Sequence, residues 1–431
     1  MQNPSAASTL LPTLGLAGLA FGLRAIFNSL GRWQNLEARV PEFITLALAA
    51  GVLYLAAVYL VERYRLDSPA LLIVLLGALM FRLAVLPSAP SISTDLYRYQ
   101  WEGRVQRLHI NPYTVAPATP GLRELKDPRH PIEAGRTVST AYPPLSEWSF
   151  SWARTLPAYK RLYTGLDLAT VAVLLALLGA LGQPLHRVLA YAWNPTVIVS
   201  FAMCGHHDAL AIVTLLAAIL FIIHRKPAVS ISFLALSVLS KFFSLLLLPI
   251  CLKRSRAAYA ALFAAVVTVA YLPYLGAGRR LFAGLSDYAA GWEGNDSLFR
   301  LIRAAGNSKA QAELVAAVVV LMLVAHALKN RMEPLGVALF LFAGLLFLSP
   351  NAFPWYFTWI VPFLCFYPRA PLLLITVTCV LGYAPVVAYA AGQPYRDSPF
   401  ILALEYAPVF GWLAFQGWQE IRSSRMESRN S

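Results

Sequence analysis

Apolar runs of roughly 20 residues recur along the whole chain and are separated by short polar segments. A helix needs about 20 apolar residues to cross the hydrocarbon core of a bilayer. We therefore expect an all-α, polytopic integral membrane protein with about 11–14 transmembrane helices. The predicted spans lie near residues 9–30, 41–62, 68–88, 163–182, 187–204, 208–223, 257–275, 312–328, 334–349, 354–368, 370–391 and 399–418.

The segment 228–251 has a different pattern, because Lys241 divides it into two half-length apolar runs. Basic residues flank both far ends, which predicts two short helices that enter the membrane and return. A charge at this depth marks by default a site for an anionic group. The alternative is that Lys241 extends to the lipid headgroups. Arg82, near the end of the third span, has the same two interpretations.

The composition agrees with a membrane protein, since 58% of the residues are hydrophobic, only 13% are charged and the mean hydropathy is +0.60. We expect residues 1–431 to form one transmembrane domain without a separate soluble domain. A net charge of +14 would favour nucleic acid in a soluble protein, but here the basic residues lie mainly in short breaks between spans. We therefore expect membrane lipids, and no nucleic acid, as partners.

The basic clusters occupy alternate breaks between spans, as the positive-inside rule requires of cytoplasmic loops. This pattern places the amino terminus in the cytoplasm. It sends two long loops, about 89–160 and 276–311, to the external (periplasmic) face of the cell inner (plasma) membrane. The first loop is expected to carry short interfacial helices. The second contains four arginines that oppose the rule and are candidate anion ligands, namely Arg279, Arg280, Arg300 and Arg303.

A short helix in the first external loop is predicted to begin at Asp95. Asp95, Tyr99 and Glu102 then share one helix face. The two carboxylates are about 10 Å apart along the axis, too far to share a proton or a metal. We expect Asp95 to be a general base and Glu102 to position substrate. The alternative is that Asp95 only belongs to the helix cap. Candidate residues for the start and end of this helix are Ser93, Thr94, Gly103 and the Asn111-Pro112 pair.

The sequence Gly205-His206-His207-Asp208, between two predicted spans, brings two imidazoles and a carboxylate to the external surface. Adjacent histidines point to different faces, and no third ligand follows at a metal-binding spacing. Hydrogen bonding to a sugar or phosphate is favoured, and a simple turn is the alternative. The four cysteines, which form no C-x-x-C pair, indicate neither zinc nor a disulfide framework. We expect no cofactor, and a divalent metal stays an open alternative.

The chain contains neither the phosphate-binding loop of ATPases nor the glycine-rich dinucleotide fingerprint. A sugar nucleotide therefore has no familiar binding site. An enzyme of this architecture would need an activated donor that already resides in the membrane.

A family resemblance follows from the motifs of the first external loop. The run from Thr94 to Arg104, followed by Asn111-Pro112-Tyr113 and by Tyr142-Pro143-Pro144, resembles this loop in bacterial GT-C superfamily glycosyltransferases. The most similar members are the polyprenol-phosphate-mannose-dependent mannosyltransferases. The resemblance continues through residues 193–195, His206-x-Asp208, Lys241 and Pro354-Trp355-Tyr356.

The resemblance implies a GT-C-like fold and an inverting transfer of a hexose, mannose above all, from a polyprenyl-phosphate donor to a lipid or glycan acceptor. It assigns the general base to Asp95. The chain differs from the family pattern at two positions: it has Glu102 and Phe353 where related proteins often carry Asp and His, respectively. The expected substrate-binding residues are Arg98, Tyr99, Glu102, Arg104, Asn111, Tyr113, Tyr142, His206, His207, Asp208, Lys241, Trp355 and Tyr356.

Two other classes of membrane protein would use similar residues. A transporter or flippase of lipid-linked sugars also needs intramembrane cations and external aromatic residues, but it usually shows paired repeats, and the chain has no such repeat. A non-catalytic subunit that binds polyprenyl lipids is the third possibility.

Overall fold

The computed structural model describes residues 6–64, 66, 68–125, 132, 135–252 and 257–430. Every regular element among these residues is a helix. Eight helices are long and apolar enough to cross a membrane, or nine if the bent pair Pro195–Met203 and Asp208–Ile223 is one span. The prediction of an all-α, multi-pass membrane protein is therefore confirmed.

The first half of the chain contains three spans, a loop with two short helices, and a second helical group. The elements in order are α1 (Ala6–Gly31), η1 (Glu37–Arg39), α2 (Val40–Arg63), α3 (Ser68–Val85), α4 (Asp95–Arg107), η2 (Pro112–Thr114), η3 (Arg123–Leu125), α5 (Pro144–Trp152), α6 (Leu156–Ala180), η4 (Leu185–Val188), α7 (Leu189–Ala192), α8 (Pro195–Ile198), the π-helix η5 (Val199–Met203), α9 (Asp208–Ile223), α10 (Pro227–Val238), η6 (Phe242–Leu247) and α11 (Leu248–Leu252).

The second half alternates spans with short 3₁₀ segments. Its elements are α12 (Ala257–Tyr271), η7 (Leu272–Phe282), α13 (Ala283–Gly291), α14 (Leu298–Ala304), α15 (Lys309–Lys329), α16 (Pro334–Leu348), η8 (Pro354–Trp359), α17 (Val361–Leu364), α18 (Ala370–Thr378), η9 (Cys379–Tyr383), α19 (Val386–Ala390) and α20 (Pro399–Asn430).

The helices of spanning length are fewer than the apolar runs because several runs are broken. Pro195 begins a new short helix inside the run 187–204, and Pro362 lies in the first turn of α17 inside the run 354–368, since proline lacks the N–H that a helix interior requires. The helix direction changes by 120° between the two halves of the bent pair. The predicted division at Lys241 is confirmed, because α10 ends at Val238 and η6 begins at Phe242.

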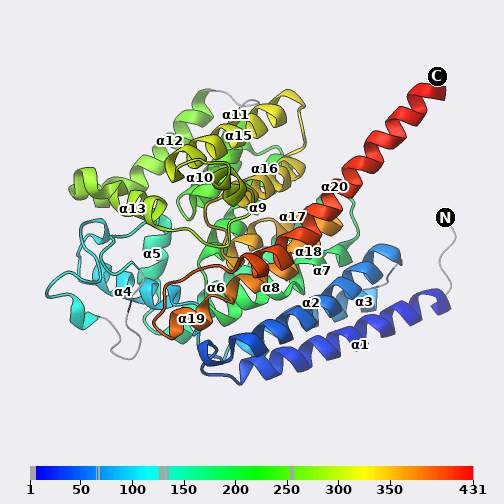
Figure 1. The fold of residues 1–431 in the computed structure, drawn as a ribbon, viewed down its shortest axis with the longest axis horizontal. Coiled ribbons are helices and arrows are strands. Elements are labelled where there is room, and N and C mark those ends of the chain that lie inside the picture. The colour runs from blue at the N-terminus through cyan, green and yellow to red at the C-terminus, as the bar shows by residue number, and fades with distance from the viewer. Residues whose placement is uncertain are drawn as a thin grey trace.

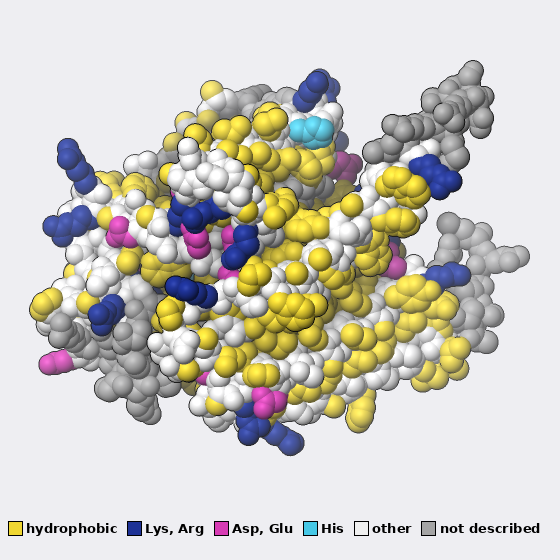
Figure 2. All heavy atoms as spheres, in the orientation of Figure 1, with side chains coloured by type: hydrophobic (Ala, Val, Ile, Leu, Met, Phe, Trp, Pro, Cys, Tyr) yellow, Lys and Arg dark blue, Asp and Glu magenta, His cyan; other side chains and the backbone are white. Residues whose placement is uncertain are grey.

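The two chain termini and the 89–160 loop lie at opposite ends of the molecule (Figure 1). Figure 1 shows the start of α1 and the end of α20 on the right, and α4 and α5 at the far left. Three antiparallel spans, α1 to α3, therefore carry the chain to the end where the 89–160 loop lies. Hydrophobic side chains cover the surface of α1, α2 and α20 (Figure 2), including Leu11 and Phe21, each 78% exposed. Such a surface suits contact with lipid.

Arg82 of α3 is fully buried and forms an internal ion pair. Its Nε and Nη2 lie 2.5 and 3.0 Å from the carboxylate of Asp167 on α6. The Tyr191 hydroxyl also donates to Asp167, and Arg82 Nη1 donates to the Ala192 carbonyl. Both sequence-based interpretations of Arg82, an anion site or a side chain extending to the headgroups, are therefore wrong. The charge is neutralised inside the bundle.

Candidate active site

Helix α4 sets the position of Asp95. Asp95 is its first residue, and Thr94 occupies the N-cap without a side-chain capping bond. The helix passes through Gly103 and ends at Arg107, so the predicted ends at Gly103 and at Asn111-Pro112 are wrong. Gly103 is required for packing instead, because a Cβ there would lie 2.0 Å from the Phe150 carbonyl oxygen of α5.

The Asp95 carboxylate faces the break between α8–η5 and α9. Its Oδ2 lies 3.5 Å from His206 Nδ1, and the side chain is 34% exposed. The surrounding protein removes enough water to raise the pKa of Asp95 to about 6, and the positive charge of Lys241 opposes this increase. A carboxyl group with this pKa can exchange protons near neutral pH.

The break presents two adjacent histidine side chains to α4. Gly205 has φ +73°, which favours glycine, and lets the chain turn between the two halves of the bent pair. His206 follows and faces Asp95. His207 Nδ1 lies 3.0 Å from the hydroxyl of Tyr99, one turn further along α4. Two successive turns of α4 thus contact two successive histidines.

Lys241 joins the site from the connection between α10 and η6. Its Nζ lies 2.8 Å from Asp208 Oδ1 and 4.6 Å from the centre of the Tyr356 ring. Trp359 Nε1 donates to the same Asp208 oxygen at 2.8 Å. Lys241 is 17% exposed, so its charge is directed to an internal carboxylate and an aromatic face.

Aromatic side chains surround these polar groups. Trp355 stacks on His206 with ring centres 4.3 Å apart, and Phe353 stacks on the other side of Trp355 at 4.9 Å. Tyr142 contacts the ring of His207 edge-on at 4.9 Å. The structure therefore brings together most of the residues that the sequence singled out. These are Asp95, Tyr99, Tyr142, His206, His207, Asp208, Lys241, Trp355 and Tyr356.

Arg98 and Glu102 lie on the loop side of α4 and contact each other. Arg98 Nε donates to Glu102 Oε1 at 2.6 Å, and its two terminal nitrogens donate to the Gly135 and Val138 carbonyls. Glu102 is fully buried near Glu147, another buried carboxyl group, which accepts from Thr140 at 2.5 Å. Burial, together with the negative charge of Glu102, raises the pKa of Glu147 well above its usual range.

The remaining predicted site residues also make contacts within the loop. Arg104 donates to the Leu125 carbonyl at 2.5 Å. Asn111 donates to the Tyr274 carbonyl at 3.1 Å, and the Tyr113 hydroxyl donates to the Tyr142 carbonyl at 2.8 Å. The Asn111 contact holds the loop against η7, and the Tyr113 contact supports Tyr142, which packs against His207 in the site.

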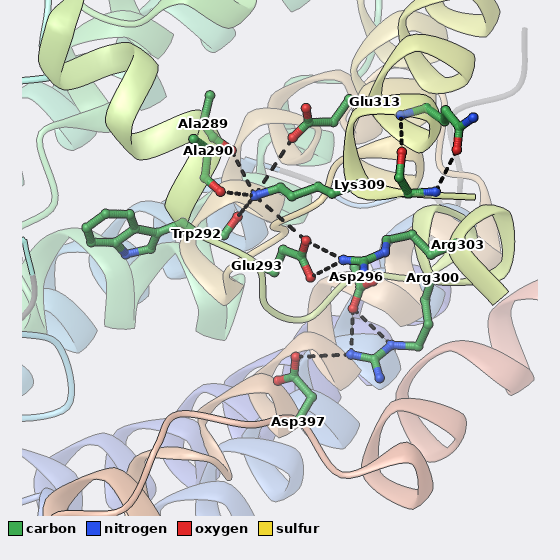
Figure 3. Close-up of polar contacts among 12 residues, drawn as sticks. Ala289, Ala290, Trp292, Glu293, Asp296, Arg300, Arg303, Lys309, Glu313 and Asp397 are labelled. Carbon is green, nitrogen blue, oxygen red and sulfur yellow. Dashed lines mark hydrogen bonds and ion pairs between the residues drawn. The ribbon is translucent and has the colours of Figure 1, made fainter. Parts of the chain in front are cut away.

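The arginines of the 276–311 segment divide into two groups. Arg300 binds Asp296 and Asp397, and Arg303 binds Glu293, as the close-up in Figure 3 shows. These two charges are already neutralised by carboxylates. Arg279 and Arg280 are exposed on η7.

Two site residues were not identified from the sequence. Trp359 lies four residues after Trp355, and this spacing could have indicated it. Tyr288 of α13 contributes a hydroxyl 2.8 Å from that of Tyr356, and no local pattern indicates it. Among the described residues, no group of three or more His, Cys, Asp or Glu side chains could hold a metal ion.

A multi-pass helical membrane protein with a carboxylate, two histidines and a lysine converging at one end of its bundle has the architecture of a membrane-embedded transferase. Comparison with known families specifies this class. Residues 6–254 match the family model described as alpha-(1->6)-mannopyranosyltransferase, N-terminal domain, and residues 294–415 match the MptB C-terminal domain. The chain belongs to this mannopyranosyltransferase family and is a mannosyltransferase. The transporter and non-catalytic alternatives are thereby set aside.

The search of curated proteins found no match for this chain. The search of solved structures found none either.

Proposed function

We propose that the protein transfers mannose from a polyprenyl-phosphate donor to a lipid or glycan acceptor at the external membrane face, with inversion and with Asp95 as the general base. The observation that carries this proposal is the position of Asp95. A partly exposed carboxylate lies where α4, the break at residues 204–207, Lys241 and the Trp355 segment meet. Family membership supports the mannosyl group.

Asp95 would act in one concerted step. An acceptor hydroxyl loses its proton to the carboxylate while its oxygen bonds to the anomeric carbon of mannose. The bond between that carbon and the phosphate oxygen breaks, and the electron pair leaves with the polyprenyl phosphate. Attack opposite the leaving group inverts the anomeric centre. Asp95 then returns its proton to water through the exposed part of its side chain.

The leaving phosphate needs fixed positive charge. Lys241 supplies an ammonium group at the site, and Asp208 and Trp359 hold it in place from behind. Arg279 and Arg280 add exposed charge on η7, the segment that leads into α13 and Tyr288. Because Arg98, Arg300 and Arg303 contact other protein groups, they are less available for this role.

Aromatic groups are suited to the sugar ring. Trp355 and Tyr356 lie beside His206 and Lys241 and present faces on which apolar sugar surfaces stack. The absence of a nucleotide-binding loop from the sequence supports a lipid-linked donor.

The test uses the purified full chain in lipid nanodiscs with a mannoside acceptor. Labelled polyprenyl-phosphate mannose and labelled GDP-mannose are supplied in parallel, and the anomeric configuration of the product is determined by NMR. We expect transfer from the lipid donor alone, with inversion, and its loss in Asp95→Asn. Transfer from GDP-mannose, or retention of configuration, would contradict the proposal.

A further inference from the structure

His206 has an unusual environment for a buried polar side chain. It is 1% exposed, and neither ring nitrogen has a hydrogen-bond partner among the described residues. A buried imidazole without partners is costly, because each polar atom loses its bonds to water. The Asp95 carboxylate lies beside it, with Oδ2 3.5 Å from Nδ1.

The local backbone presents this ring to Asp95. The π-helix Val199–Met203 ends directly before the turn, and the backbone N–H of His206 donates to the Ser200 carbonyl at 2.9 Å. Gly205 allows the left-handed turn, and it also lies against Leu96 of α4, where an added Cβ would come within 3.1 Å. The turn is therefore packed directly against the first turn of the Asp95 helix.

The plane of the ring is fixed by stacking. Trp355 lies against it at 4.3 Å with an interplanar angle of 15°, and Phe353 continues the stack behind Trp355 at an angle of 8°. The contact between His207 and Tyr99 holds the same turn to α4 a second time. These contacts hold the plane of the imidazole and the turn that carries it beside Asp95.

We propose that His206 is a positioning residue for the general base. Its Nδ1–H donates to Oδ2 of Asp95, which leaves the other carboxylate oxygen directed to the acceptor hydroxyl. This inference rests on the proposed role of Asp95. A neutral imidazole in this tautomer orients the carboxylate without neutralising it, so Asp95 keeps the negative charge that a base needs.

Other groups also act on Asp95. Arg98 and Tyr99 approach it from its own helix, and Lys241 and Asp208 act on it from across the break. Tyr99 also forms a side-chain hydrogen bond to Asp95. His206 differs from these four because its Nδ1 lies 3.5 Å from Asp95 Oδ2 and its ring nitrogens have no hydrogen-bond partner among the residues described.

The first test is His206→Phe, which keeps a ring stacked on Trp355 but removes the donor. We expect kcat to fall on the order of 10–100-fold, as for loss of a hydrogen bond to a charged group. The KM for polyprenyl-phosphate mannose should stay within about twofold, because the ground-state contacts of the donor are retained. The acid limb of the kcat/KM profile should move up by about one pH unit, since Asp95 loses a bond that favours its charged form. A structural role alone would not move this limb.

A matched pair keeps the test decisive if His206→Phe fails to fold. His206→Asn and His206→Leu have similar size, and only the asparagine retains a donor near the Nδ1 position. We expect the asparagine protein to be at least about tenfold more active than the leucine protein. His326→Phe, an exposed position on α15, is the control for a generic histidine effect.

Two outcomes separate the inference from the proposed function. If Asp95→Asn is inactive while His206→Phe keeps the parental kcat and pH profile, the role of His206 is overturned and the base stands. If Asp95→Asn is fully active, the proposed base itself is wrong. Equal activity of the asparagine and leucine proteins also overturns the role of His206.

Discussion

Lys241 Nζ lies 2.8 Å from Asp208 Oδ1, so the most isolated charge of the sequence is paired inside the protein with a fully buried carboxylate. Asp208 is the first residue of α9, and Lys241 follows α10, the next helix. The pair therefore links the break in the bent span to the division between two half-length helices. Any phosphate that Lys241 binds must share the ammonium group with Asp208.

Lys241→Met is expected to weaken donor binding and to lower the melting temperature. The second effect follows because Asp208 would be left as an unpaired buried charge. The double variant Lys241→Met/Asp208→Asn should regain much of the lost thermal stability but not the donor affinity. Thermal unfolding and binding of polyprenyl-phosphate mannose are measured for both proteins. Unchanged donor affinity in both would remove Lys241 from the donor site.

Asp95→Asn should reduce turnover on the order of 10²–10⁴-fold while donor binding is largely retained, because a general base acts on the transition state. Asparagine can still cap a helix, so near-normal activity would indicate a cap instead. Glu102→Gln is the control, and a smaller loss is expected, since Glu102 contacts Arg98 inside the loop.

The activity of the parent protein should depend on pH through Asp95. Its pKa is raised to about 6, and only the deprotonated carboxylate can accept a proton. We therefore expect kcat/KM to fall as the pH decreases below about 6 and to level off above it. Initial rates between pH 5 and pH 8 test this, and a profile that stays flat through pH 5 would argue against Asp95 as the base.

Glu147 should make the loop less stable at high pH. Its raised pKa means that the folded protein retains a proton that the unfolded chain releases at lower pH. The resulting stabilisation is fully present below the unfolded pKa of about 4.3 and is lost as the pH rises towards the folded value. In Glu147→Gln the side chain resembles the protonated carboxyl group and stays neutral at every pH. We expect its melting temperature at pH 8 to equal or exceed that of the parent, and a large decrease would contradict a protonated Glu147 in the folded protein.

Replacing only one partner of the Arg82–Asp167 ion pair should destabilise the fold, whereas replacing both partners with apolar residues should be tolerated. Arg82→Met alone leaves a buried carboxylate and is expected to cost on the order of 3–5 kcal/mol. Arg82→Met with Asp167→Leu should recover most of that loss. Arg187→Gln is the control, because its partner Glu62 is 27% exposed and surface pairs contribute little. Equal losses in the buried and surface variants would contradict this account.

The predicted membrane topology has a direct test. Cysteines introduced at Gly121 and at Ser255 should react with an impermeant thiol reagent from the outside and the inside respectively, because the basic residues that flank Ser255 predict a cytoplasmic loop. Gly121 is exposed, and Ser255 lies outside the described residues. Labelling of both from one side would show that the assigned orientation is wrong.

The sequence alone determined the features that depend on neighbouring residues. Apolar runs predicted a multi-pass membrane protein, because a bilayer imposes a length on any helix that crosses it, but they did not show which runs are broken into shorter helices. Lys241 marked the division between two short helices, and the loop motif predicted Asp95 as the general base. Helix ends were less predictable. Gly103, expected to end α4, lies inside it because close packing on α5 leaves no room for a side chain.

Only the tertiary structure decided which charges face each other. His207 and Tyr99 are 108 positions apart, and Trp359 and Asp208 are 151 apart, so no local period relates them. In the sequence, Lys241 and Arg82 were candidate anion ligands and Arg98 was a candidate substrate-binding residue. Packing pairs Arg82 with Asp167 and Arg98 with Glu102, and it sets Lys241 between Asp208 and Tyr356. The reason is that a buried charge must find a partner, and the partner available depends on how distant helices meet.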